Sequence, residues 1–574
     1  MFVVAVVFLA HTTHVLCHPT ARWHGFDCGG SDTRGRSGRS SHHRPSPPPP
    51  SETHFPVAHL VSSGLGVSIE CITTHRASAY PNRWMKFSRL LLLSILNILR
   101  SGVSVSHPRC PNMSIDLSLN RIRLLLSHLP TYRRPTCHIA GTNGKGSVSA
   151  LLSSILQASS PPLSVGRFNS PHLLSIRDSI VINNKPVTAD LYDQVRGEVE
   201  KLNQELGAQA SKFEVLTSTA MTIFETLGLD IVVMEVGMGG RLDATNAIPD
   251  DAIAVSALTS VDLDHQGFLG NTVAEIAREK VGIARRGKPF VLGRQKFPKV
   301  EEVVRNTVLG DDIQGHLIRA VEPVELFSED QDPHGHTPVS IPLPCFPEPL
   351  RGKLPLHGSH QLSNLGVAST VVSELLTHPS CSRLKLSGRI TPETFASGLA
   401  KTTWPGRLSF HTLPNGKRIL VDGAHNQGSA QTLADFIATR LPSLSTTNEP
   451  LNITYILGLS HSPPKEPLDT LAPLFSPSLL SHPSIKANVA ALEFFSPDDM
   501  PWVKAEPPSI IYDAVKVHCP RAMLWSPSEG KSGLSDALDW ATDVSGDSGL
   551  VVLAGSLYLV ADFYRLINSG RNGL

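Results

Sequence analysis

The sequence has almost no net charge, and this limits the kinds of partner that it can have. Its 574 residues include 51 Lys and Arg and 50 Asp and Glu, which leaves a formal net charge of +1. A nucleic-acid-binding protein that depends on a strong basic field carries a clear excess of Lys and Arg. We therefore expect no nucleic-acid partner. The charge is unevenly distributed, because residues 1–112 are basic while the rest of the chain is slightly acidic.

Paired cysteines are also missing. None of the eight cysteines belongs to a Cys-x-x-Cys pair, so neither a zinc knuckle nor a redox dithiol is indicated. Single cysteines scattered over a chain of this length are typical of a reducing compartment. The expected location is therefore the cytoplasm, with the mitochondrion as the alternative.

The sequence also has few long apolar runs near its start. The runs at 2–10 and 90–99 are too short to span a bilayer comfortably, so no stable membrane insertion is expected. Between them lies a Ser-, Arg- and Pro-rich tract that cannot bury enough surface to become ordered. Residues 1–112 are predicted to be a disordered or targeting extension, and translated sequence upstream of the true start is a third interpretation. Met113 then opens a segment with helical apolar spacing.

From residue 113 onward, apolar strand-like runs alternate with helical patterns. A chain of this length exceeds what one hydrophobic core usually supports, so two domains are expected. The pattern predicts an α/β fold, in which a mostly parallel sheet flanked by helices occupies 113–401. A smaller Rossmann-like α/β domain is predicted over 402–574. The strands expected in the two domains are 137–140, 230–236, 252–258 and 290–292, then 418–421, 453–457 and 551–554.

A glycine loop carries the clearest chemical signal. The expected strand at 137–140 leads into Gly141-Thr142-Asn143-Gly144-Lys145-Gly146-Ser147, and a helix follows at 148–158. This arrangement presents backbone N–H groups and a helix N-terminus to phosphate. Lys145 can reach the β- and γ-phosphates of a nucleotide, and Ser147 can offer its hydroxyl to Mg²⁺. A simple glycine-rich turn is the alternative, but it would not require the flanking strand and helix.

Acidic and basic side chains follow the next expected strands. Glu235 ends an apolar run and enters a glycine turn, which is where metal–phosphate chemistry occurs in α/β sheets. Because Mg²⁺ needs few protein ligands, Glu235 together with phosphate oxygens would suffice. His265 follows the later strand at 252–258, where a turn residue and a metal ligand are equally compatible. Lys280 lies on a helix expected over 272–284, whose charges alone predict a solvated face.

Nine motifs, taken together, resemble the folate branch of the Mur ligase superfamily, which comprises dihydrofolate synthases and folylpolyglutamate synthases. They cover about residues 113–574 and read GTNGKGS, RFNSPHL, EVGMGGRLDATN, LDHQGFLG, AREKVGI, HQLSN, WPGRL, VDGAHN and AGSLYLV. The resemblance implies a P-loop ATPase domain followed by the smaller Rossmann-like ligase domain. It also implies an ATP-dependent ligase that activates a carboxylate as an acyl phosphate, which the amino group of L-glutamate then attacks.

The resemblance assigns roles to individual residues by their positions in these motifs. It implies that Lys145, His265 and Lys280 are catalytic, with Lys280 in the place of the family's carbamylated lysine. It implies two Mg²⁺ ions, one bound by Ser170 and Glu235 and the second by His265. Beyond the glycine loop, the implied ATP-binding residues are Asn364, Arg407, Asp422 and His425. The residues that match pteroate-contacting positions are Phe213, Leu242, Asp243 and Ala244.

Two substrates remain as alternatives for the carboxylate. Asn143 and Arg241 resemble dihydrofolate synthases, whereas eukaryotic folylpolyglutamate synthases typically carry lysine at the first position. The expected substrates are therefore 7,8-dihydropteroate, L-glutamate and ATP. The protein is expected to be a monomer. Tetrahydrofolate, used by a folylpolyglutamate synthase or a bifunctional enzyme, is the alternative. The glutamate-binding residues stay open, because the segment 458–466 departs from the family pattern.

Two other functions are less well supported. A non-catalytic nucleotide-binding protein of this fold would be expected to lack at least one of Lys145, Glu235, His265 and Lys280, and all four are present. A cell-wall Mur ligase is disfavoured by the RFNSPHL and GRLDATN segments.

Overall fold

The computed structural model divides the chain into two units, Met1–Met113 and Ser114–Leu574. The described residues are 57–63, 66–72, 118–327, 335–444, 451–461, 466–476, 479, 485–497, 500, 503–527 and 533–569. In the first unit, β1 (Val57–Ser63) pairs antiparallel with β2 (Gly66–Ile72). The rest of the extension predicted over 1–112 lies outside the described residues.

The larger sheet of the second unit has eight strands in the order β10-β9-β8-β3-β7-β4-β5-β6. The six strands from β10 to β4 run parallel, and β5 and β6 are added antiparallel at one edge. The mostly parallel sheet predicted from the sequence is therefore confirmed. In chain order the strands are β3 (Thr136–Ala140), β4 (Val165–Phe168), β5 (Ile180–Ile182), β6 (Lys185–Pro186), β7 (Ile231–Glu235), β8 (Ile253–Leu258), β9 (Pro289–Leu292) and β10 (His316–Arg319).

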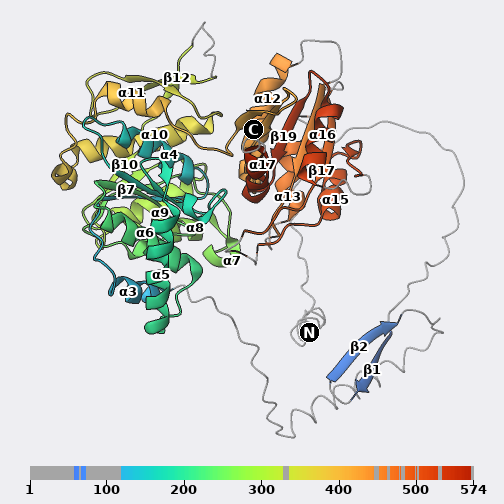
Figure 1. Ribbon diagram of the computed structural model, residues 1–574, viewed down its shortest axis with the longest axis horizontal. Coiled ribbons are helices and arrows are strands. Elements are labelled where there is room, and N and C mark those ends of the chain that lie inside the picture. Colours follow the sequence, from blue (N-terminus) through green and yellow to red (C-terminus); the bar gives the residue numbers. More distant parts are fainter. Residues whose placement is uncertain are drawn as a thin grey trace, which may run out of the picture. The chain divides into compact units, whose positions relative to one another are not determined.

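Helices surround this sheet, as Figure 1 shows. They are α3 (Asn120–Leu126), α4 (Lys145–Gln157), α5 (Ala189–Glu205), α6 (Lys212–Thr226), α7 (Gln266–Leu269), α8 (Val273–Val281), α9 (Pro298–Val308), α10 (His360–Thr377) and α11 (Pro392–Ala400). The strands β3, β7 and β8 are buried along their whole length. A strand covered on both faces needs a continuous apolar run, which is the pattern that the sequence shows.

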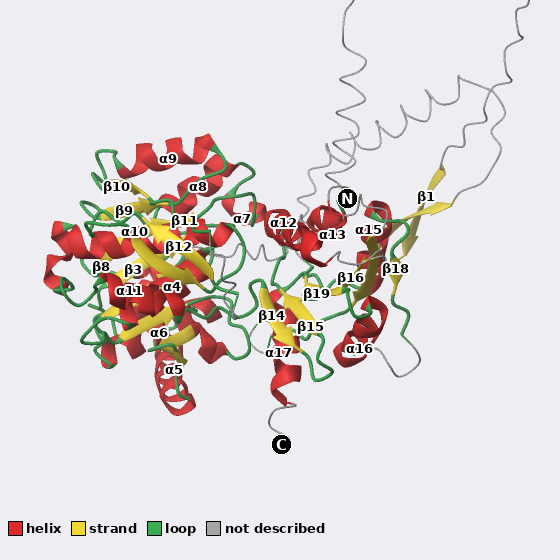
Figure 2. Ribbon diagram, turned by 90° about the horizontal axis from the view of Figure 1, so that it is seen from above, coloured by secondary structure: helices red, strands yellow, loops and turns green. Residues whose placement is uncertain are grey.

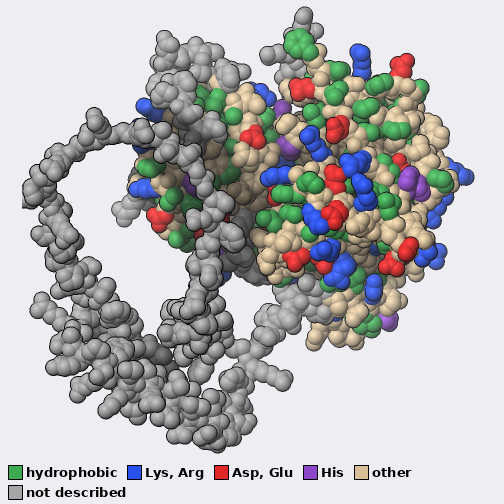
Figure 3. Space-filling model, turned by 180° about the vertical axis from the view of Figure 1, so that it is seen from behind, with side chains coloured by type: hydrophobic (Ala, Val, Ile, Leu, Met, Phe, Trp, Pro, Cys, Tyr) green, Lys and Arg blue, Asp and Glu red, His purple; other side chains and the backbone are tan. Residues whose placement is uncertain are grey.

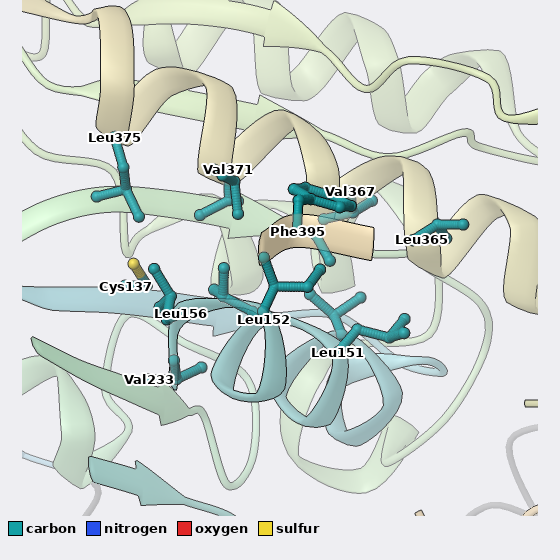
Figure 4. Packing of buried hydrophobic residues seen from close by; sticks show 14 of the residues in the cluster. Cys137, Leu151, Leu152, Leu156, Val233, Leu365, Val367, Val371, Leu375 and Phe395 are labelled. Atoms are coloured by element: carbon teal, nitrogen blue, oxygen red, sulfur yellow. The ribbon is translucent and has the colours of Figure 1, made fainter. Parts of the chain in front are cut away.

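Helix α4, which follows the glycine loop, is almost entirely buried. Figure 4 shows Leu151, Leu152 and Leu156 of α4 facing Val371 of α10, with Phe395 of α11 beside them. Burying side chains of this size contributes about 1.5–3 kcal/mol each. The core therefore holds rigidly the helix that carries the phosphate-binding loop.

A three-stranded antiparallel sheet lies within the first predicted domain, before the predicted boundary at residue 402. It consists of β11 (Val324–Glu325), β12 (Thr337–Ile341) and β13 (Leu350–Leu354). Helix α11 packs against β13. The Pro-rich stretch at 333–355, for which the sequence predicted no element, thus contributes two strands to this small sheet.

The C-terminal sheet has six strands in the order β14-β15-β19-β16-β17-β18 (Figure 2). All neighbouring pairs are parallel except β14 with β15. The strands are β14 (Ser409–Thr412), β15 (Arg418–Val421), β16 (Leu451–Leu457), β17 (Ile485–Ala491), β18 (Met523–Leu524) and β19 (Leu550–Ala554). Its main helices are α12 (Gln427–Leu444), α13 (Pro467–Leu471), α15 (Pro508–His518), α16 (Leu534–Ser545) and α17 (Leu557–Ser569). A second α/β layer after residue 402, as the sequence predicted, is present.

Charged side chains of both signs are mixed on the face shown in Figure 3, where Lys and Arg lie among Asp and Glu. The near-zero net charge of the whole chain results from the basic residues 1–112 and the slightly acidic remainder, which offset each other. Within the described ranges, no helix combines the length and the apolar character needed to cross a bilayer.

The topology places the predicted motifs at one edge of the large sheet. The glycine loop follows β3, Asn169 and Ser170 follow β4, Gly237 lies beyond β7, and Thr259 follows β8. Since these four strands are neighbours and parallel, their carboxyl ends meet at the same edge. Ligands of open α/β sheets bind at this edge.

Candidate active site

The glycine loop connects the end of β3 to the first turn of α4. Gly144 is the N-cap of α4 and has φ +92°, a conformation that L side chains rarely adopt. A Cβ at Gly144 would also lie 3.1 Å from Cγ of Asn364. The loop therefore requires glycine here for its backbone to turn into the helix. The N-terminus of α4, with its unpaired N–H groups, is left pointing out of the sheet edge.

Residues after β8 hold the glycine loop in place. The Thr259 hydroxyl donates to the carbonyl of Asn143 at 2.7 Å, and the N–H of Thr142 donates to the carbonyl of Ser260 at 2.8 Å. Thr142 also exchanges hydrogen bonds with the backbone of Asp262, at 3.1 and 3.2 Å. The loop is therefore fixed before any ligand binds, which lowers the entropic cost of binding phosphate.

Two lysines approach the same backbone oxygen. Lys145 donates to the carbonyls of Gly141 and Thr142 at 3.2 and 3.3 Å. Lys280, from α8, donates to the carbonyl of Gly141 at 2.9 Å and is only 3% exposed. Burial, and then the positive charge of Lys145, lower the pKa of Lys280 to about 7. A buried amine of this kind is uncharged in a large fraction of molecules near neutral pH.

Glu235 lies at the end of β7 with its carboxylate buried. Its Oε2 accepts a hydrogen bond from Nδ2 of Asn169 at 2.6 Å, and its Oε1 is 3.8 Å from Nζ of Lys145. Burial raises the pKa of Glu235, while Lys145, Asn169, Arg407 and Arg167 each act to lower it. The carboxylate is thus desolvated and compensated by cations, which is the state from which a metal ion is readily bound.

The surroundings of Glu235 fit Mg²⁺. Glu235, Ser147 and Ser170 line one cavity and offer a carboxylate and two hydroxyls, which are hard oxygen donors of the type that Mg²⁺ prefers. Next to them, Oδ1 of Asn169 is buried and has no hydrogen-bond partner in the described structure. No cluster of three or more His, Cys, Asp or Glu suited to a metal occurs in the described part of the chain. A cation that keeps its waters and takes phosphate oxygens as ligands suits such a site.

Helix α10 contributes two buried amides to the loop. Gln361 donates from Nε2 to the hydroxyl of Ser147 at 3.2 Å, and Asn364 donates from Nδ2 to Oε1 of Gln361 at 2.9 Å. Both residues are at most 7% exposed. The sequence predicted Asn364 as an ATP-binding residue, and the structure places it against Gly144.

The C-terminal part supplies the charged side chains of Arg407 and Asp422 to the cavity. Arg407 precedes β14 and Asp422 follows β15, and the negative charge of Asp422 acts on the pKa of Arg407 against the effect of burial. Asp422 accepts a hydrogen bond from the N–H of Leu408 at 2.8 Å. His425 donates from Nδ1 to the carbonyl of Gly423 at 2.8 Å, so its Nε2 is the acceptor nitrogen when the ring is neutral.

Asn426 connects the two halves of the site. Its Nδ2 donates to Oδ2 of Asp264 at 3.1 Å and lies 3.5 Å from Oδ1 of Asn143. The next residue of that loop, His265, has φ +51°, and its N–H donates to Oδ1 of Asp264 at 2.9 Å. Asp264 thus stabilises the strained backbone at His265, and Asn426 of the C-terminal part in turn holds Asp264 in place.

One cavity of about 680 Å³ joins these groups. Of the predicted site residues, those lining it are Thr142, Asn143, Gly144, Lys145, Gly146, Ser147, Ser170, Glu235, His265, Asn364, Arg407, Asp422 and His425. Gly141 and Lys280 lie just behind the loop, joined by their hydrogen bond.

The four predicted pteroate contacts lie farther from this cavity. Phe213, on α6, packs on Gly237, which lines the cavity. Asp243 accepts hydrogen bonds from Met238 N–H at 2.8 Å and from Thr245 N–H and hydroxyl at 3.0 and 2.5 Å. Both of its oxygens are thus occupied by its own loop.

The other two predicted contacts differ in burial. Ala244 is buried against Leu119 and Ile122 of the chain around α3, whereas Leu242 is half-exposed. The structure therefore gives Asp243 and Ala244 a part in shaping the loop after β7.

Several residues of the site were missed by sequence reasoning. Asn169 and Arg167 were seen only as parts of a turn motif, and Gln361, Trp404 and Asn426 were assigned no role. His360 also lines the cavity, and its pKa is lowered to about 4 by burial and by the charge of Arg407. Gln361, Trp404 and Asn426 contact the glycine loop. Asn169 donates to Glu235, and Arg167 lies over Trp404. These partners are distant in sequence, so the motifs alone do not indicate the contacts.

Comparison with known proteins agrees with this geometry. The family described as "Dihydrofolate synthetase, C-terminal domain" matches residues 408–566. The chain is 35% identical to the dihydrofolate synthetase of Saccharomyces cerevisiae over 473 residues, covering 80% of this chain and 99% of that protein. It is 30% identical to the probable dihydrofolate synthetase of Schizosaccharomyces pombe, covering 79% and 99%.

A solved structure shares the fold. The folylpolyglutamate synthase of Mycobacterium tuberculosis, solved in complex with ADP, superposes with a TM-score of 0.63 at 28% identity and covers 79% of this chain and 94% of that chain. The shared motifs, the overall sequence identity and the shared fold therefore indicate the same family. The chain belongs to the family of Mur-type ligases formed by the dihydrofolate synthetases and folylpolyglutamate synthases.

Proposed function

We propose that this protein uses ATP to join L-glutamate to 7,8-dihydropteroate, which yields 7,8-dihydrofolate, ADP and phosphate. One observation carries the proposal: a buried carboxylate, Glu235, lies beside Lys145 at the N-terminus of α4, with Arg407 reaching the same cavity. Phosphoryl transfer needs this combination of an anion-binding helix end, cations and a metal-binding carboxylate. The ADP complex of the related mycobacterial enzyme supports a nucleotide as the ligand.

The residues act by holding and neutralising charge. The carboxylate of dihydropteroate would attack the γ-phosphorus of ATP, which forms an acyl phosphate and releases ADP. The amino group of L-glutamate would then attack the acyl carbon and displace inorganic phosphate. Lys145 and Arg407 offset the negative charge that develops on the phosphoryl oxygens, and the fixed glycine loop keeps the phosphates aligned.

Mg²⁺ would be held by Glu235 and Ser170, with Ser147 on the phosphate side and His265 placed for a second ion. When bound, it would supply charge neutralisation of the phosphates. Metal binding requires the ionised carboxylate of Glu235, whose pKa is raised by burial while Lys145, Asn169 and Arg407 act in the opposite direction.

Lys280 is proposed to carry a carbamate. Its amine is buried and its pKa is lowered to about 7, so the neutral form that can attack CO₂ is well populated. Carbamylation would turn the cation behind Gly141 into an anion that compensates Lys145. Incubation with ¹³C-bicarbonate should produce a carbamate carbon signal that is absent from Lys280→Met. Its absence from the active wild-type protein would refute the modification.

Dihydropteroate is favoured over tetrahydrofolate because the related proteins from both yeasts are named dihydrofolate synthetases. Asn143 adds support, since eukaryotic folylpolyglutamate synthases typically carry lysine at this position of the loop. The test is phosphate release by the purified protein with dihydropteroate, tetrahydrofolate and tetrahydrofolate monoglutamate as competing acceptors. Dihydropteroate should give the highest kcat/KM, and a protein that uses only tetrahydrofolate would overturn the proposal.

The monomeric state and the cytoplasmic location, with the mitochondrion as alternative, are part of the same proposal. Sizing chromatography coupled to light scattering tests the first. Terminal-peptide analysis of the native protein tests whether residues before Met113 persist in the mature chain.

A further inference from the structure

Trp404 lies directly against the glycine loop. A Cβ placed on Gly146 would be 3.0 Å from Cε2 of Trp404, 3.2 Å from its Nε1 and closer still to Cζ2. The guanidinium carbon of Arg167, at β4, lies 5.2 Å from the centroid of the same indole. Gly146 therefore leaves the space that Trp404 fills, and the indole bridges the first turn of α4 to β4.

The segment 398–402, which leads to Trp404, is hydrogen-bonded to α4. The hydroxyl of Ser154 on α4 donates to the carbonyl of Gly398 at 2.7 Å, and Thr402 donates to the same carbonyl at 3.3 Å. Phe395, also on α11, packs in the core that covers α4 (Figure 4). The connection between the large sheet and the C-terminal sheet thus follows the phosphate-binding helix toward its N-terminus.

Arg407 comes only three residues after Trp404. Three residues span at most about 11 Å when fully extended, so the position of the indole limits where the guanidinium can lie. Between them, the N–H of Gly406 donates to the Ser409 hydroxyl at 2.9 Å and to the Tyr564 hydroxyl at 3.1 Å. The short link is therefore anchored to the C-terminal part at one end and to the glycine loop at the other.

We propose that Trp404 is a positioning residue that sets Arg407 in register with the glycine loop. Because its indole packs against the first turn of α4, Trp404 fixes the distance between that turn and the guanidinium of Arg407, which the C-terminal part contributes to the phosphate site. Trp404 does not contact the reacting atoms in this role. The proposal rests on the nucleotide-binding site described under the proposed function, and it is independent of which folate is the acceptor.

The alternative is that Gly146 is required by the ligand alone, so that a backbone N–H can approach phosphate, while Trp404 merely fills the core. The two explanations predict different activities for the variant that carries substitutions at both 146 and 404. If Gly146 exists to make room for the indole, the cost of a methyl group at 146 depends on what occupies 404. If the ligand alone requires Gly146, that cost is the same in every background.

The experiment is a double-mutant cycle of Gly146→Ala and Trp404→Ala on the full chain. It is read out by ADP affinity and by ATP turnover with the acceptor that the wild-type protein uses best. Each single variant should lower kcat about tenfold or more while changing the Kd for ADP by less than about threefold, because a misplaced cation costs the transition state more than the ground state. The double variant should fall within about twofold of Trp404→Ala alone.

Losses that multiply to about 100-fold in the double variant, as independent sites would give, overturn the proposal. Unchanged kcat in a folded Trp404→Ala also overturns it. Trp404→Phe should recover most of the turnover, since an aromatic ring still bridges the loop and β4. If Trp404→Ala fails to fold, Trp404→Leu, which keeps an apolar side chain but removes the aromatic ring, replaces it in the cycle, and the same outcomes decide.

Two matched controls separate the specific effect from general damage. A Cβ added at Gly197, on α5, would meet open space, so Gly197→Ala should leave turnover unchanged. Trp540 packs near Trp525, with ring centroids 6.4 Å apart, in a different cluster. Trp540→Phe should affect stability more than kcat. Because turnover is measured with whichever acceptor the wild-type protein uses best, failure of the dihydropteroate assignment is distinguished from failure of this proposal.

Discussion

Lys280 donates a hydrogen bond to the backbone carbonyl of Gly141 at 2.9 Å, from the side of the glycine loop opposite the cavity. The carbonyl is the first of the loop, and Lys145 approaches it as well, at 3.2 Å. Two ammonium groups thus meet at one oxygen, and the buried one has the lowered pKa. When both amines are protonated, their positive charges repel each other at the loop. A bound polyphosphate, or a carbamate on Lys280, would reduce this repulsion.

Removing Lys145, the less buried lysine of this pair, should abolish turnover with little effect on folding. Lys145→Ala is expected to lower kcat/KM for ATP by at least about 100-fold, the loss typical of a removed charge-stabilising donor. The free energy of unfolding should change by no more than about 1 kcal/mol, because Lys145 lines the cavity and its hydrogen bonds to the loop carbonyls are long, at 3.2 and 3.3 Å. Lys201→Ala, an exposed lysine of α5, is the matched control. A large loss of stability would show that Lys145 is mainly structural.

The metal role of Glu235 predicts a changed Mg²⁺ requirement. Glu235→Ala should raise the Mg²⁺ concentration for half-maximal turnover by about tenfold or more, because Glu235 adds a negative charge to the hydroxyl ligands Ser147 and Ser170. Glu235→Gln should behave similarly while preserving volume. Titration of turnover with Mg²⁺ at fixed ATP measures this. A variant with unchanged metal dependence would remove Glu235 from the site.

Removing a neighbour of Glu235 should shift the pH profile. The hydrogen bond from Asn169 lowers the pKa of Glu235, so Asn169→Ala should raise it. Activity that needs ionised Glu235 is lost as the pH falls through that pKa. The acid limb of the kcat/KM profile should therefore move to higher pH in the variant. An unmoved acid limb would mean that another group controls it.

Lys280 predicts a stability that rises with pH. Its pKa is about 7 in the folded protein against 10.5 in the unfolded chain, so between these values the unfolded state binds more protons. Stability contributed by this group is lowest below pH 7 and increases up to about pH 10, with a slope of at most about 1.4 kcal/mol per pH unit.

The measurement is urea unfolding in CO₂-free buffer, with Lys280→Met as the comparison. The variant should exceed the wild type in stability at pH 6, and the difference should shrink toward pH 10. A pH-independent difference would show that the ammonium is not desolvated in the native state.

Strand and helix patterns were predicted well where the signal is local. The apolar runs at 230–236 and 252–258 correspond to β7 and β8, because a strand buried on both faces must be continuously apolar. Helix α8 is shorter than the predicted 272–284 and ends at Val281. Strands β12 and β13 were not predicted, since the prolines around them indicate loops when the partner strands are unknown.

The sequence by itself determined the glycine loop, its flanking strand and helix, and the chemistry of Lys145 and Glu235, because these depend on residue type and near neighbours. The role of Arg407 was implied only by the family resemblance. Only the tertiary structure decided which residues surround them. Lys280 belongs to a charged helical segment that predicts solvent exposure, yet packing of α8 buries its amine behind Gly141. Trp404 and Gly146 are far apart in sequence, and no local pattern indicates that they touch. Long-range packing places these side chains at the loop, and the physical reason for the extra glycine at 146 appears only when the indole that fills its space is seen.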